Sequence, residues 1–127
     1  MKSKYSLPKD GGLIAESTPR DILHRYEKMP TTVFETESEG AQCIADRIVA
    51  AINAHRGTEP FALGLTTGRT PLGLYRELAE RHARGEVSFR NVAVYSLDEF
   101  YPIASTEQQS RNYRIHEDLL NHVDILP

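Results

Sequence analysis

The chain has 127 residues, which suits a single domain, and with 39% apolar and 26% charged residues it is too apolar for a disordered segment. Its 15 basic and 18 acidic side chains give a net charge of -3 at pH 7, so no basic excess is present to bind nucleic acid, and no run approaches the roughly 18 apolar residues of a membrane helix. The single cysteine, Cys43, cannot form an internal disulfide, which favours a cytoplasmic protein over a secreted one.

Residues 1–30 differ in composition from the rest of the chain. They contain all four lysines, a Gly-Gly pair and three prolines that would interrupt a long helix or strand. The basic start, Met1–Pro8, is followed by no apolar stretch, so we predict no secretory signal. A short helix is expected at Asp21–Lys28. We interpret residues 1–30 as an N-terminal extension or linker, and residues 31–127 as the domain proper.

From residue 31 the chain alternates predicted strands and helices. Residues 31–35 favour a short strand, and Thr36–Glu39 has the pattern of a capping box at the start of a helix. This helix should end near residues 55–57, where cationic groups precede a glycine. Its buried face is predicted to carry Ile44, Ile48 and Ile52, flanked by Ala41, Ala45 and Ala51, with Cys43 buried next to them.

Two short apolar runs, Phe61–Leu65 and Asn91–Leu97, predict strands that are covered on both faces. Between them Pro71 should open a helix that stops near Gly85, and another helix is expected from about Ser110. The order predicts an α/β fold: a Rossmann-like open parallel sheet with helices on both faces. Ligands of such sheets bind at the carboxyl ends of the strands, so the important loops are 66–70 and 98–109.

The first of these loops, Thr66–Thr70, has the features of an anion site. Gly68 permits close backbone approach, Thr67 and Thr70 supply hydroxyl donors, and the following helix offers unpaired N–H groups. The alternative is structural, with Thr70 capping the helix and Gly68 only turning the chain, and the spacing leaves both interpretations open. No Gly-Lys-Ser/Thr follows, which disfavours a nucleotide.

The second loop begins with two adjacent carboxylates, Asp98 and Glu99. In extended backbone they point to different sides, so one can act as a general base while the other orients the loop. The alternative is an Asp that caps the loop beside a solvated Glu. The five histidines show no metal-ligand spacing, so we predict no metal site.

Four motifs occur in order along the chain, namely Leu63–Tyr75, Val87–Phe89, Leu97–Phe100 and His122–Ile125. Together they resemble the N-terminal half of the glucosamine-6-phosphate deaminase (isomerase) family, over about residues 31–127. The resemblance implies a fragment of a larger α/β domain that converts glucosamine 6-phosphate and water to fructose 6-phosphate and ammonia, without metal or organic cofactor. The family's ring-opening Asp-His-Glu residues belong to its C-terminal half, so we expect this fragment alone to be inactive.

The resemblance also implies roles for individual residues. The loop residues Thr67, Gly68 and Thr70 would bind the sugar phosphate. Asp98 would be the base that moves a proton between C2 and C1 of the open-chain sugar, with Glu99 as a supporting carboxylate beside it. The expected partner is therefore a small-molecule sugar phosphate, with no membrane and no nucleic acid. Related deaminases are often hexamers, and the sequence leaves a homo-oligomer open.

Some positions depart from the family pattern. Arg69 replaces a small residue and could contact the phosphate or point to solvent, and Phe100 replaces a tyrosine. Ser110–Tyr113 is similar to the Ser-Asn-Tyr of 6-phosphogluconolactonases, relatives with the same fold. Those lactonases have Asp-Glu-Arg where this chain has Asp-Glu-Phe, so we favour the deaminase. The alternatives are a 6-phosphogluconolactonase-like hydrolase and a non-catalytic sugar-phosphate-binding or regulatory domain.

Overall fold

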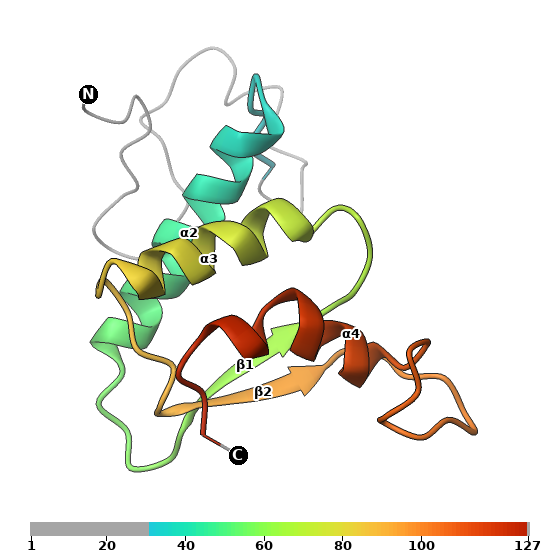
Figure 1. The fold of residues 1–127 in the computed structure, drawn as a ribbon. Helices are drawn as coiled ribbons and strands as arrows, with labels where there is room; N and C mark the ends of the chain where they lie inside the picture. The colour runs from blue at the N-terminus through green and yellow to red at the C-terminus, as the bar shows by residue number, and fades with distance from the viewer. Residues whose placement is uncertain (1–30, 127) are drawn as a thin grey trace. The chain divides into compact units, whose positions relative to one another are not determined.

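The computed structural model describes residues 31–126, and from Phe34 onward these belong to one compact unit. The elements, in chain order, are α2 (Glu37–Ala54), β1 (Phe61–Leu65), α3 (Leu72–Ala83), β2 (Val92–Ser96), α4 (Arg111–Asp118) and the 3-10 helix η1 (Leu120–His122). Strands β1 and β2 pair in parallel, as Figure 1 shows. The predicted α/β fold is thereby confirmed. The expectations for residues 1–30, including a helix at Asp21–Lys28, lie outside the described residues.

Helix α2 begins and ends where the sequence predicts. The Thr36 hydroxyl accepts a hydrogen bond from the backbone N of Glu39 at 3.2 Å. In return the Glu39 carboxylate accepts one from the backbone N of Glu35 at 3.2 Å. This is a capping box whose return bond is displaced by one residue. At the other end the C-cap is His55.

Helix α3 ends at the predicted glycine. Gly85 has a φ of 75°, a left-handed conformation that is costly for residues with a side chain. Its backbone N donates to the carbonyl of His82 at 2.8 Å, and the N of Glu86 donates to the carbonyl of Arg81 at 3.0 Å. These two bonds form the Schellman motif that typically terminates a helix.

The predicted strand at residues 31–35 is wrong. Residues 31–34 have no regular structure, and the backbone N of Glu35 is taken by the cap of α2. A strand forms by hydrogen bonding to a neighbouring strand, whatever the propensity of its residues. Within residues 31–126 the strands β1 and β2 pair only with each other, so this segment has no such neighbour.

The core lies on one face of the two-stranded sheet. Leu63 and Leu65 of β1 and Val92 of β2 are buried on this face, because alternate residues of a strand point the same way. The α-helices α2, α3 and α4 contribute side chains to the same cluster: Ala45 and Val49 from α2, Tyr75 and Leu78 from α3, and Ile115 from α4. On this side β1 is therefore covered more completely than β2, whose Val94 and Ser96 are half-buried.

The other face of the sheet is not covered by residues 31–126, in contrast to the expectation of helices on both faces. Ala62 and Gly64 of β1 are exposed, and so are Tyr95 at 60% and Leu97 at 70%. The physical reason is that the apolar faces of the described helices all converge on the opposite side. None of these helices is long and apolar enough to span a bilayer.

The buried face of α2 is rotated from the predicted one. Ala41, Ala45 and Val49 are buried, whereas Ile44 is 46% exposed. Small residues bring α2 close to α3, since a Cβ placed on Gly73 would lie 3.7 Å from that of Ala41. The larger residues therefore lie at the rim of this contact. Of the remaining predicted members, Ile48, Ile52 and Cys43 are half-buried and Ala51 is exposed.

Two of the sequence motifs, Val87–Phe89 and His122–Ile125, meet in the structure. The Asp124 carboxylate accepts hydrogen bonds from Ser88 Oγ at 2.7 Å and from the backbone N of Phe89 at 2.6 Å. Burial alone would raise the pKa of Asp124, but the hydrogen bonds from Phe89 and Ser88 lower it overall. These motifs therefore fasten the C-terminal segment to the start of β2.

Candidate functional site

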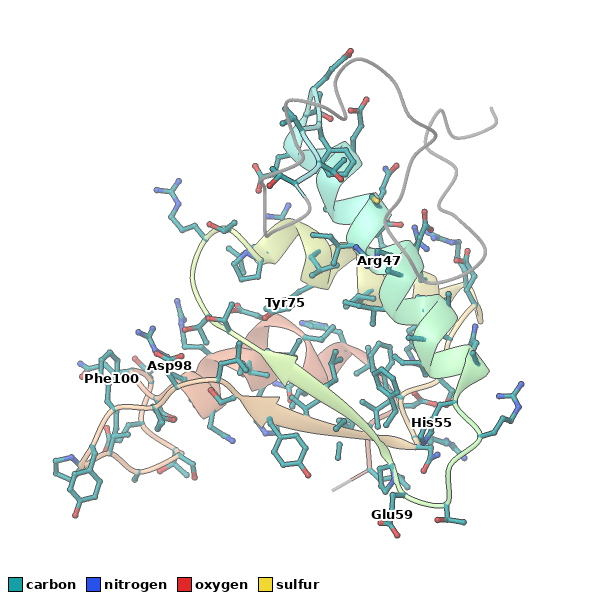
Figure 2. All side chains as sticks on the ribbon, turned by 180° about the vertical axis from the view of Figure 1, so that it is seen from behind. Arg47, His55, Glu59, Tyr75, Asp98 and Phe100 are labelled. Carbon is teal, nitrogen blue, oxygen red and sulfur yellow. The ribbon has the colours of Figure 1, made fainter. Side chains whose placement is uncertain are left out.

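The two loops that the sequence predicts to be important lie at the same end of the sheet. Loop 66–70 follows β1 and loop 98–109 follows β2, and parallel strands have their carboxyl ends on one side. Figure 2 shows Asp98 and Phe100 at this end of the sheet and His55 and Glu59 at the opposite end. Open α/β sheets bind ligands in the crevice outside these carboxyl ends.

The loop after β1 is fixed to α3 by a buried tyrosine. The Tyr75 hydroxyl donates a hydrogen bond to the backbone carbonyl of Thr66. Burial raises the pKa of Tyr75, which keeps this donor protonated. Gly68 has a φ of 123°, which residues with a side chain rarely adopt, and a Cβ there would meet no described atom within 4 Å. The backbone therefore requires the glycine, and the space beside it is open to a ligand.

The structural alternative for Thr70 is wrong, because the N-cap of α3 is Pro71. The exposed Thr70 hydroxyl makes no hydrogen bond within residues 31–126. Arg69 is also exposed and forms no ion pair in this part of the chain. Both polar groups are therefore free to contact a ligand at this loop.

Asp98 follows directly after β2 and presents its carboxylate at the same end of the sheet. Its backbone carbonyl accepts a hydrogen bond from Ser96 Oγ at 2.6 Å, which fixes the turn out of the strand. Its side chain is 57% exposed, and Oδ2 lies 3.3 Å from Nε of Arg111. A carboxylate that is oriented by one cation and otherwise accessible is suited to accept a proton from a ligand.

The Glu99 side chain does not lie beside the Asp98 carboxylate but binds the start of α4. Its carboxylate accepts hydrogen bonds from the backbone N of Arg111 at 2.9 Å and from that of Asn112 at 3.1 Å. It also accepts from the buried Ser110 Oγ at 2.7 Å and from the backbone N of Phe100 at 2.9 Å. These hydrogen bonds lower the pKa of Glu99 to about 2, and the bond from the backbone N of Arg111 has the largest effect. In this arrangement Glu99 supports Asp98 by fixing the loop and the helix around it.

We predict that Glu99→Gln destabilises the protein at neutral pH and makes its stability less dependent on pH. The folded pKa of Glu99, about 2, lies below its ordinary value of 4.5. Its contribution is therefore complete above pH 4.5 and is lost as the pH falls towards 2. Thermal unfolding between pH 3 and 7 measures this. Glu107→Gln, in the same exposed loop, is the control and should leave the pH profile unchanged; equal profiles for all three proteins would contradict the prediction.

Arg111 joins the two loops, and the sequence interpretation did not identify it. Its Nη1 donates a hydrogen bond to Thr67 Oγ1 at 2.9 Å, its Nε lies 3.3 Å from Asp98 Oδ2, and its Cζ lies 4.5 Å from the centre of the Phe100 ring. One sequence feature points to it: a cation in the first turn of a helix is unfavourable next to the positive end of the helix dipole. Such a residue needs another reason to be there.

Residues 35–127 match the model of a protein family described as glucosamine-6-phosphate isomerases/6-phosphogluconolactonase. A glucosamine-6-phosphate isomerase of Candida albicans is 37% identical over 97 residues, which cover 76% of this chain and 38% of that protein. A glucosamine-6-phosphate deaminase of Aliivibrio fischeri is 45% identical over 85 residues, which cover 65% of this chain and 32% of that protein. The chain thus spans about a third of the length of these relatives.

Solved structures show the same fold. A monomeric glucosamine-6-phosphate deaminase superposes with a TM-score of 0.71 at 29% identity, over 78% of this chain and 40% of the other. A 6-phosphogluconolactonase from Leishmania guyanensis superposes with a TM-score of 0.59 at 26% identity, over 78% of this chain and 39% of the other. The likeness to the deaminase is the greater of the two in both measures.

Proposed function

Because the chain belongs to the family of glucosamine-6-phosphate isomerases and 6-phosphogluconolactonases, we propose that the intact protein carrying it is a glucosamine-6-phosphate deaminase. It would convert glucosamine 6-phosphate and water to fructose 6-phosphate and ammonia, in amino-sugar metabolism. The curated relatives, at 37% and 45% identity, are a glucosamine-6-phosphate isomerase and deaminase. Since the chain spans only part of their length, we propose that residues 1–127 alone do not catalyse the reaction.

The observation that carries this proposal is the pairing of an open loop with a carboxylate. Thr67, in the loop after β1, and Asp98, after β2, are both bound by Arg111 at the carboxyl end of the sheet. A sugar phosphate has an anion at one end and its reacting carbons at the other. The loop would hold the phosphate, and Asp98 would face the carbons.

In this arrangement the proposed chemistry needs one base that works twice. Asp98 takes the proton from C2 of the open-chain sugar, and the C1 oxygen gains a proton from water, which leaves an enolamine. Asp98 then returns a proton to C1, and the nitrogen loses one proton to solvent. The product carries an imine at C2, and addition of water to this imine releases ammonia and leaves the ketone of fructose 6-phosphate. Glu99 would not touch the sugar, because its carboxylate is occupied by the start of α4.

The proposal is tested with the intact protein and two substrates. We expect release of ammonia and fructose 6-phosphate from glucosamine 6-phosphate, and no acceleration of 6-phosphogluconolactone hydrolysis. Lactone hydrolysis without ammonia release would assign the protein to the hydrolase branch. Binding of glucosamine 6-phosphate without turnover of either compound would instead indicate a sugar-phosphate-binding domain. Both outcomes would overturn the proposal.

We predict that Thr70→Val raises the KM for glucosamine 6-phosphate by about 10-fold, the loss of roughly 1.5 kcal/mol from one hydrogen bond to a charged group. Its hydroxyl has no hydrogen-bond partner within residues 31–126, so the free energy of unfolding should change by less than about 0.5 kcal/mol. Steady-state kinetics and thermal unfolding measure the two effects. Glucosamine without the phosphate serves as the control. An equal loss with both sugars would show that the loop does not bind phosphate.

A further inference from the structure

Each interaction of Arg111 uses a different part of its guanidinium group. Nη1 donates to Thr67, Nε faces Asp98, and Cζ lies over the Phe100 ring, 4.5 Å from its centre. The planar fork of an arginine can make such contacts at the same time, whereas the single ammonium of a lysine cannot. Arg111 therefore connects a residue after β1 to residues after β2.

The backbone from which the Arg111 side chain extends is held in place by hydrogen bonds. Its backbone N donates to Glu99 Oε1 at 2.9 Å, and the neighbouring Ser110, which is fully buried, donates to the other oxygen of Glu99 at 2.7 Å. The Ser110 hydroxyl also accepts from the backbone N of Tyr113 at 3.3 Å as the N-cap of α4. A side chain that starts from a capped helix and ends on two loops transmits the position of one loop to the other.

The contact between Arg111 and Asp98 leaves the carboxylate accessible. Although Arg111 Nε is buried and only 3.3 Å from Asp98 Oδ2, it has no hydrogen bond of good geometry within residues 31–126. The ion pair therefore orients the Asp98 carboxylate without saturating it. A group that must accept a proton from a bound substrate needs to be oriented while its oxygens remain available.

We propose that Arg111 is a positioning residue, which holds Asp98 at a fixed distance and angle from the phosphate loop so that the anchored sugar meets its base. This inference rests on the proposed deaminase function. It predicts that loss of the side chain lowers kcat, because a misplacement of about 1 Å between substrate and base can cost about 100-fold in rate. An arginine whose contacts served only the stability of the fold would leave kcat unchanged.

The kinetic test compares Arg111→Met, Arg111→Lys and the control Arg114→Met in the intact protein. Arg114 lies one turn along the same helix, is exposed and has no ion-pair partner within residues 31–126. Well below the melting temperature, we expect kcat to fall about 10- to 100-fold in Arg111→Met and less in Arg111→Lys. Values of kcat for both Arg111 variants within twofold of Arg114→Met would overturn the proposal. If Arg111→Met does not fold, a kcat of Arg111→Lys within twofold of that of Arg114→Met would by itself overturn the proposal.

Hydrogen exchange tests the connection between the loops without relying on activity. In Arg111→Met, amides of residues 66–70 and of residues 98–103 should both exchange faster than in Arg114→Met. Faster exchange in only one loop, or in neither, would overturn the positioning role. A wild-type protein that releases no ammonia would refute the proposed deaminase function, and the exchange data would still decide whether Arg111 couples the loops.

Discussion

Asp98→Asn is expected to lower the release of ammonia from glucosamine 6-phosphate by roughly 100- to 10,000-fold, the usual loss on removal of a general base. The amide has the shape of the carboxylate but cannot accept the C2 proton. The KM should change little, because the phosphate loop is untouched. Asp98 is 57% exposed and, among the described residues, forms one ion pair, with Arg111, so the fold should tolerate the change.

Solvent exchange at C2 gives this prediction a second measurement. With glucosamine 6-phosphate deuterated at C2, the wild-type protein should remove the deuterium from C2, either to water or to C1 of the product, and Asp98→Asn should not. Glu59→Gln is the control, since Figure 2 places Glu59 at the opposite end of the sheet from Asp98. Turnover of Asp98→Asn close to that of Glu59→Gln would show that another group is the base.

The parts of the fold that depend on local chemistry were predictable from the sequence. The hydroxyl of Thr36 caps the start of α2, and the left-handed Gly85 terminates α3. Both act through bonds within a few residues, so the residue types alone indicate them. The strand at residues 31–35 could not be judged in this way, because it depends on a neighbouring strand. The exposure of Ile44 depends similarly on where small residues let α2 approach α3.

Some features of the candidate site were likewise predictable from the sequence, and others were not. The positions of Thr70 and Asp98 follow from strand order alone, because parallel strands bring the following loops together. The different roles of Asp98 and Glu99 do not follow from strand order, because they depend on the start of α4 lying beside Glu99. The contact between Arg111 and Thr67 joins residues 44 positions apart and is visible only in the folded chain.

Phe89→Ala is expected to lower the free energy of unfolding by about 3–5 kcal/mol, as is usual when a buried phenylalanine is truncated. Phe89 is fully buried, and its ring packs edge-on against His82 with centroids 6.2 Å apart. The hydrogen bond from its backbone N to Asp124 does not involve the ring, so the variant removes core volume and leaves that bond available. Thermal unfolding of the intact protein should show a decrease of about 10 °C.

The matched control is Tyr101→Ala, which removes a larger aromatic side chain that is 98% exposed and should change the melting temperature by little. If Phe89→Ala does not fold, Phe89→Leu, which keeps most of the volume, should lower stability by less than about 1.5 kcal/mol. Phe89 precedes β2, at the end of the sheet opposite Asp98, so kcat should survive in Phe89→Leu. Equal melting temperatures for Phe89→Ala and Tyr101→Ala would mean that the Val87–Phe89 motif does not anchor the core. Loss of kcat with unchanged stability would mean that this end of the sheet takes part in the chemistry, which the arrangement of loops at the carboxyl end argues against.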